Sequence, residues 1–151
     1  GIAPDAGSWT PIQSAFLACL QVRLDAITGH YGANGFSLNA VMRELNGLVD
    51  DAIRFTESHR SLPPIANLRD EFRTTVALEL AAAQLLALCT APVMPRFAER
   101  LANALGGTKL DAWRDHVDLV PPGTEIALAN TRFFSLPSAA ATSERSEKAV
   151  A

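Results

Sequence analysis

Histidine and cysteine are the residues of this sequence most able to catalyse a reaction or bind a metal ion, and they are few and scattered. The three histidines, His30, His59 and His116, stand at no metal-ligand spacing and beside no nucleophile motif. Cys19 and Cys89 lie in apolar helical stretches and form no CxxC pair. We therefore expect two reduced core thiols, and no metal site and no cofactor in this chain.

Motifs typical of catalytic sites are also absent from the sequence. It contains no GxSxG segment and no glycine-rich phosphate loop. Asp50 and Asp51 are adjacent, and neighbouring residues on a helix point about 100° apart, so the two carboxylates do not form a close dyad. We expect them on a solvated helix face, and we expect no catalysis by this chain alone.

Arginines are the remaining candidates for binding. Arg69 and Arg73 are four residues apart, as are Arg96 and Arg100, so each pair shares one helix face and can hold a phosphate. Acidic residues lie close to both pairs, which favours ordinary surface ion pairs instead. These acidic neighbours are Asp70, Glu71 and Glu99.

A further basic group lies near the end of the second predicted helix. His59 stands beside Arg60, and Arg54 lies less than two turns earlier. These three are our candidate phosphate-binding, and therefore RNA-binding, residues. The alternative is a solvated helix end whose cations interact only with the helix dipole.

Composition indicates a globular chain with a substantial core. Of the 151 residues, 48% are hydrophobic and 19% are charged, and the formal net charge of -3 argues against a stand-alone, high-affinity nucleic-acid binder. No signal peptide is visible at the N-terminus. The longest apolar stretch, 76–88, contains Glu79 and Gln84 and is too short to span a bilayer. We expect a cytoplasmic protein without a membrane partner.

Start and stop signals predict an all-α fold, an antiparallel bundle of four main helices. Thr10 and Gln13 form a capping box around Pro11. The helices are expected from Pro11 to Gly29 or Gly32, from Ser37 to before Pro63, from Leu68 (capped by Asn67) to about Cys89, and from Pro95 to Gly106. The third is apolar on several sides, so it belongs in the middle of the bundle.

Apolar residues at helical spacing predict the buried face of each helix. The faces are Ile12, Phe16, Cys19, Leu20, Leu24 and Ile27; then Leu38, Val41, Met42, Leu45, Leu48, Val49, Ala52 and Ile53; then Phe72, Val76, Leu80, Ala83 and Ala87; and finally Phe97, Leu101 and Leu105. Charged residues of the second helix, including Glu44, Asp51 and Arg54, are expected to face solvent.

The remainder of the chain carries weaker signals. A short helical turn is expected after Thr108, with Leu110, Trp113 and Val117, and 125–134 has a strand-like pattern that is expected to pack over the bundle. From 138 onward the chain is small, polar and charged, which predicts disorder. The domain division is thus a flexible N-terminus at 1–9, a helical domain at 10–137 and a disordered tail at 138–151.

The segment LLALCTAPVMPRFAERLANALGG resembles the proline-flanked elbow between two helices of the anticodon-binding domain of methionyl-tRNA synthetases, which are class I enzymes. Pro92 stops one helix and Pro95 starts the next, with Val93 and Met94 expected to fill the corner. The likeness extends upstream through LNAVMRELNGLVDDAIRFTESHRSL and downstream to TEIALANTRFFSLP, roughly residues 12 to 137. It implies a helical tRNA-binding appendage of a methionine–tRNA ligase or of a paralogue.

Several functional residues of that family have no counterpart here. The family reads the anticodon with an Asn and an Arg on its first helix, which has no match in this chain, and with a Trp whose position aligns with Leu62 or its neighbours. Ile53 stands where the family has a nearby Asn, and neither aliphatic side chain can stack on a base. The HIGH-type and KMSKS-type catalytic signatures are missing too.

Three hypotheses follow from these observations. The chain is a tRNA-binding appendage without the expected anticodon-reading residues, whose parent protein would catalyse ATP-dependent aminoacylation; or it is a synthetase-derived module for protein interaction or scaffolding; or it is an unrelated bundle with a coincidental elbow. The corresponding partners are tRNA, a synthetase catalytic domain or another protein.

Overall fold

The computed structural model describes residues 1–60 and 68–134 of the chain. Four α-helices follow one another: α1 (Pro11–Tyr31), α2 (Leu38–Arg60), α3 (Leu68–Thr90) and α4 (Pro95–Ala104), with a short 3-10 helix, η1, at Leu128–Asn130. Strands are absent from the described ranges, which hold one isolated bridge between Ile2 and Glu125. The predicted all-α bundle of four main helices is confirmed. The predicted tail at 138–151 and the Asn67 cap lie outside the described residues.

The capping box that begins α1 also joins this helix to α3. Thr10 Oγ1 accepts a hydrogen bond from the Gln13 N–H, and Gln13 Oε1 accepts one from the Thr10 N–H. The Gln13 amide then donates to Glu71 O at 2.7 Å and to Thr75 Oγ1 at 3.0 Å. Gln13 is therefore buried, while Ile12, which the spacing places on the buried face, is 63% exposed. The polar side chain faces inward here because all its hydrogen bonds are made there.

The buried face of α2 is narrower than the sequence predicts. Ser37 Oγ accepts a hydrogen bond from the Ala40 N–H and so begins the helix as expected. Of the predicted face, Val41, Leu45 and Leu48 are buried, whereas Leu38, Met42, Val49 and Ile53 are exposed. A helix with two neighbours buries one stripe and leaves the adjoining stripe to solvent. Ala40 and Phe55, which the spacing did not place on this face, are buried as well.

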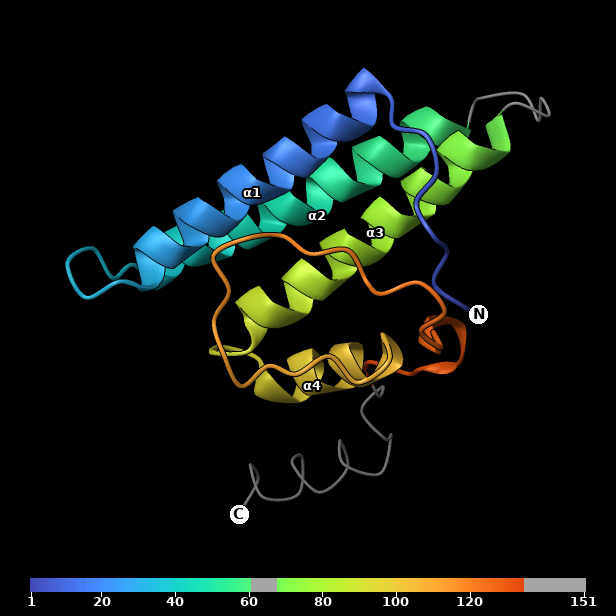
Figure 1. The fold of residues 1–151 in the computed structure, drawn as a ribbon. Helices are drawn as coiled ribbons and strands as arrows, with labels where there is room; N and C mark the ends of the chain where they lie inside the picture. The colour runs from blue at the N-terminus through green and yellow to red at the C-terminus, as the bar shows by residue number, and fades with distance from the viewer. Residues whose placement is uncertain (61–67, 135–151) are drawn as a thin grey trace, which may run out of the picture.

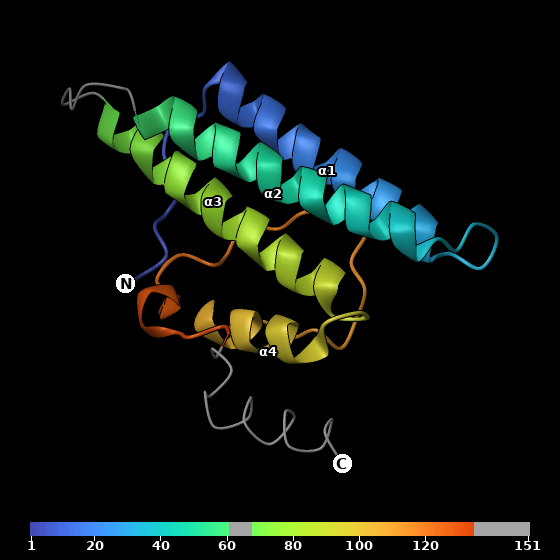
Figure 2. The same ribbon diagram turned by 180° about the vertical axis from the view of Figure 1, so that it is seen from behind.

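Helix α3 is the central helix of the bundle and packs against α1, α2 and α4 (Figures 1 and 2). The span Asp70–Thr90 is 21 residues long and contains an 18-residue window with a mean hydropathy of 1.4, so by length and composition alone it could cross a bilayer. This span is longer than the apolar stretch 76–88 that the sequence indicates. Within the protein, 67% of the window is buried, so packing against the other helices accounts for its apolar composition.

The elbow forms where the prolines predict it. Helix α3 ends at Thr90, whose carbonyl accepts hydrogen bonds from the Val93 and Met94 N–H groups, and Pro95 occupies the first turn of α4. Val93 packs against the main core, whereas Met94 is 38% exposed, so only one of the two fills the corner. Gly106 ends α4 with a φ of 91°, a conformation that glycine adopts without strain.

The first residues of the chain are tied to the segment after α4. The sequence predicts a flexible N-terminus; in the structure Ala3 N–H donates to Thr124 O at 2.8 Å and Gly123 N–H donates to Ala3 O at 2.9 Å. Ala3 is buried in a second apolar cluster that lies between α3 and α4 and includes Leu80 and Leu101. Backbone pairing between distant segments leaves no local signal in a sequence.

The helical turn expected after Thr108 is not formed. Instead the chain at 108–120 runs as an irregular loop across α1 and α3 (Figure 1, orange). Trp113 Nε1 donates to Thr28 Oγ1 at 2.8 Å, and the Val117 N–H donates to Gln21 Oε1 at 3.1 Å. These two bonds fasten the loop to α1, and contacts with α1 override its local helical preference. The strand-like stretch contributes the Glu125 bridge and then η1.

The elbow provides a stability test. Replacing both Val93 and Pro95 with alanine should lower the free energy of unfolding by about 1–3 kcal/mol, because packing and a helix-starting proline are lost. Met94→Ala removes a side chain that is 38% exposed and belongs to neither apolar cluster, and it should change the free energy of unfolding by less than about 0.5 kcal/mol. Thermal or urea denaturation measures both. An unchanged double variant, or an equal loss in Met94→Ala, would contradict this description of the elbow.

Candidate functional site

The structure places the predicted phosphate-binding residues Arg54, His59 and Arg60 in the last two turns of α2. The side chains of His59 and Arg60 lie outside the described residues. The Arg54 side chain is exposed; its Nε donates to Asp50 O at 3.2 Å, and its Nη2 lies 3.6 Å from Asp51 Oδ1. A helix C-terminus favours cations, so this end of α2 is a suitable position for a small positive surface.

An ion-pair network that the sequence analysis did not predict links α1 to α2. Arg23 Nη1 lies 2.6 Å from Glu44 Oε2, and its Nη2 lies 2.9 Å from Asp51 Oδ2. Both carboxylates are mostly buried, which corrects the expectation that they face solvent. Gly47 is the signal in the sequence, because a Cβ at this mid-helix position would lie 2.6 Å from the Arg23 guanidinium carbon. The network joins α1 to α2. Because Arg23 is paired with two carboxylates, its charge is not available to bind a phosphate.

The surroundings of both thiols favour the protonated form. Cys19 Sγ donates to Asp51 Oδ2 at 3.3 Å, and partial burial, followed by this hydrogen bond, raises the pKa of the thiol. Burial raises the pKa of Cys89 to about 12. Both therefore remain protonated near neutral pH. No three His, Cys, Asp or Glu side chains gather at metal-binding distance within the described ranges 1–60 and 68–134.

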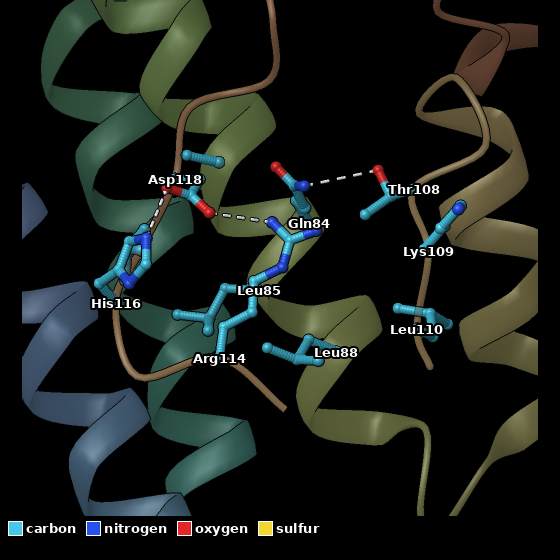
Figure 3. A pocket seen from close by; sticks show the side chains of 11 residues that line it. Gln84, Leu85, Leu88, Thr108, Lys109, Leu110, Arg114, His116 and Asp118 are labelled. Atoms are coloured by element: carbon cyan, nitrogen blue, oxygen red, sulfur yellow. Dashed lines mark hydrogen bonds and ion pairs between the residues drawn. The ribbon is translucent and has the colours of Figure 1, made fainter. Parts of the chain in front are cut away.

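A polar hollow lies under the 108–118 loop, beside α3 (Figure 3). His116 Nδ1 lies 2.6 Å from Asp115 Oδ1, and its Nε2 lies 3.0 Å from Asp118 Oδ1. Arg114 Nη1 donates to the other Asp118 oxygen at 3.0 Å. The hydrogen bond with Asp115, then the charge of Asp118, raises the pKa of His116, while the imidazole lowers the pKa of Asp115.

Within the His116 cluster the charges are paired: when His116 is protonated, two cations face the carboxylates of Asp115 and Asp118. Lys109 also lines the hollow and Asp115 does not, so the lining as a whole carries more positive than negative charge. A histidine whose proton is held by carboxylates on both sides is also a poor general base. Deeper in the hollow, the Gln84 amide nitrogen lies 3.5 Å from Thr108 Oγ1, and its buried carbonyl oxygen has no partner among the residues that the structure describes. The arrangement braces the loop against α3.

Of the other arginines, two are committed to bonds within the protein. Arg73 Nη2 pairs with Asp70 Oδ1 at 2.9 Å, as its acidic neighbour suggests. Arg100 Nη1 donates to Phe133 O at 3.0 Å, so it does not form a phosphate-binding pair with Arg96. The side chain of Arg69 lies outside the described residues.

No protein-family model and no curated protein matches the sequence. Solved structures do match the fold. The free methionyl-tRNA synthetase of Mycobacterium tuberculosis superposes with a TM-score of 0.72 and 21% identity, over 91% of this chain and 29% of the synthetase.

Two further structures of the same enzyme, both with methionyl-adenylate, give TM-scores of 0.66 and 0.63 at 21% and 22% identity. Each covers 83% of this chain, and 25% and 26% of the synthetase. The chain therefore has the fold of a helical part of these synthetases and spans less than a third of their length.

The His116 cluster predicts a specific titration. By NMR, the pKa of His116 should lie above its ordinary value of 6.5, should fall most in Asp115→Asn, and should fall less in Asp118→Asn. Because the folded pKa is raised, the stabilising contribution is present below pH 6.5 and is lost as the pH rises through the folded pKa. A His116 pKa at or below 6.5 in the unmodified protein would show that the loop does not hold these contacts in solution.

Proposed function

We propose that this chain is a helical module of a methionine–tRNA ligase or of a paralogue, and that it contacts the phosphate backbone of tRNA without reading the anticodon. The observation that carries the proposal is the shared fold over 91% of the chain with methionyl-tRNA synthetase. The elbow from Pro92 to Pro95, which the sequence shares with that family, adds support. Because the chain spans only 29% of the synthetase, aminoacylation itself would belong to another part of such a protein.

The end of α2 is the proposed contact. Arginine and protonated histidine bind phosphate oxygens through charge-assisted hydrogen bonds, and an arginine can hold two oxygens at once. Arg54 is exposed but shares its charge with Asp51, which lies 3.6 Å away. Arg60 lies in the final turn of α2, nearest the negative end of the helix dipole, and we expect it to contribute more to the salt-dependent affinity than Arg54.

Base recognition is not part of the proposal. Reading an unpaired base requires a stacking surface and hydrogen-bonding groups at its edge. Ile53, which stands in place of the family's Asn, is half exposed on α2 and offers only aliphatic carbon. Leu62 offers no aromatic face either. Contacts to phosphates carry no sequence information, so different tRNAs should bind alike.

The test is the binding of labelled tRNA to the purified chain at about 50 mM and about 200 mM salt. We expect affinity to fall with salt and to be similar for tRNAs with and without a CAU anticodon. Arg60→Ala should weaken binding and reduce the slope of log Kd against log salt by about 0.7–0.9, the value for one lost phosphate contact.

Arg43→Ala is the matched control, because Arg43 is 74% exposed near the start of the same helix. It should leave the affinity unchanged. Absence of salt-sensitive binding at low salt would overturn the proposal. A loss in Arg43→Ala as large as in Arg60→Ala would place the contact elsewhere, and a preference of about tenfold or more for CAU would contradict the absence of base reading.

A further inference from the structure

An apolar groove runs along the outer side of α2 and α3. It has a volume of about 450 Å³, and Figure 2 shows no described element lying over the two helices on this side. The opposite side of α3 is crossed by the 108–127 segment (Figure 1). We call this feature the α2–α3 groove; its lining is Leu48, Val49, Ala52, Ile53, Thr56, Glu57, Glu79, Ala82, Ala83 and Leu86.

The shape of the α2–α3 groove fits a third helix. Exposed apolar residues continue its two walls lengthwise, with Met42 on α2 and Phe72 on α3. Alanines at 52, 82 and 83 keep its floor low, so a helix can approach closely. Two neighbouring helices with apolar stripes form a furrow into which the side chains of another helix interdigitate.

The charges of the groove specify what kind of helix fits. Its two ionisable residues, Glu57 and Glu79, are both acidic and lie toward the end of α2. Glu79 Oε1 accepts a hydrogen bond from Thr56 Oγ1 at 2.7 Å. Neither carboxylate has an ion pair with the side chains that the structure describes, those of residues 1–58 and 70–134. A second copy of this chain would bring the same two carboxylates to the interface and no lining cation, so charge complementarity favours a different partner.

We propose that the α2–α3 groove binds one amphipathic helix of a partner protein, which buries an apolar stripe along Val49, Ile53 and Leu86 and places a lysine or arginine at Glu57 and Glu79. Burial of the apolar stripe supplies the affinity. The basic residue sets the direction of the helix, because only one orientation brings the cation to the acidic end. The groove adjoins the proposed tRNA contact, because Glu57 lies between Arg54 and Arg60 on α2, but its occupant is a protein helix and its tests use no tRNA.

The probe is a designed 18-residue helical peptide with leucines at one face and two lysines flanking that face at one end, roughly five turns long. Its control has glutamates in place of the lysines. We expect the lysine peptide to bind at least about tenfold more tightly than the glutamate peptide by fluorescence anisotropy. In Glu79→Gln the difference between the two peptides should shrink.

Substitutions in the protein test whether the peptide binds in the α2–α3 groove. Ile53→Glu places a charge on the groove wall at a position that is 50% exposed. It should lower the affinity for the lysine peptide at least about tenfold. Val22→Glu, on the exposed face of α1, is the matched control, because Val22 is 66% exposed and far from the groove lining; it should have no effect. If circular dichroism shows that Ile53→Glu loses helix, Val49→Ser tests the same wall.

Four results would overturn the proposal. These are failure of the lysine peptide to bind, equal binding of the two peptides, and equal weakening by Ile53→Glu and Val22→Glu. The fourth is sedimentation of the chain as a dimer that Ile53→Glu dissociates, which would make a second copy the occupant of the groove. None of these measurements involves tRNA, so their outcome is distinguishable from that of the proposed function.

Discussion

Burial of α3 is the constraint on which the other contacts of the bundle depend. Each of the other three helices packs against it, and so does the loop after α4. Polar bonds at both of its ends fix the alignment: Gln13 of α1 donates to Glu71 O near the start of α3, and Tyr31 Oη donates to Cys89 O near its end. A helix surrounded in this way must be apolar on most sides, which explains why its composition approaches that of a membrane span.

Local signals in the sequence predict the helices well. The capping box at Thr10, the Pro92 to Pro95 elbow and Gly106 each act within a few residues, and the structure has a helix end at each of them. The resemblance to methionyl-tRNA synthetases, made from the elbow and its flanking helices, agrees with the fold match. Periodicity was less reliable, because it identifies apolar residues but not the number of neighbours that a helix has. Ile12 and Ile53 are exposed for this reason.

The remaining features depend on contacts between distant segments. The pairing of Ala3 with Thr124, the course of the loop at Trp113 and the Arg23 network join residues that are far apart in sequence. Only Gly47, a glycine in the middle of a helix, hints at the last of them. The α2–α3 groove could not be predicted from the sequence for the same reason. Its walls belong to the predicted buried faces, and only the packing of the helices shows which apolar residues remain exposed.

These contacts also limit the positive surface that is available to an RNA. Arg23, Arg73 and Arg114 are each paired with carboxylates, and the net charge is -3. A small basic region at the end of α2 would give modest affinity by itself. Joined to a second tRNA-binding unit, it would add to the total through effective concentration. The role of an appendage therefore suits this chain better than that of an independent RNA-binding protein.

The central claim is that tRNA meets this fold at the end of α2. The most direct measurement is the change in backbone amide NMR shifts of the labelled chain as a tRNA anticodon stem–loop is added at low salt. The account predicts that the changes centre on 54–60 and leave the 108–118 loop and the α2–α1 ion pairs unaffected. Absence of shift changes, or changes centred on α4 or the 108–118 loop, would contradict it.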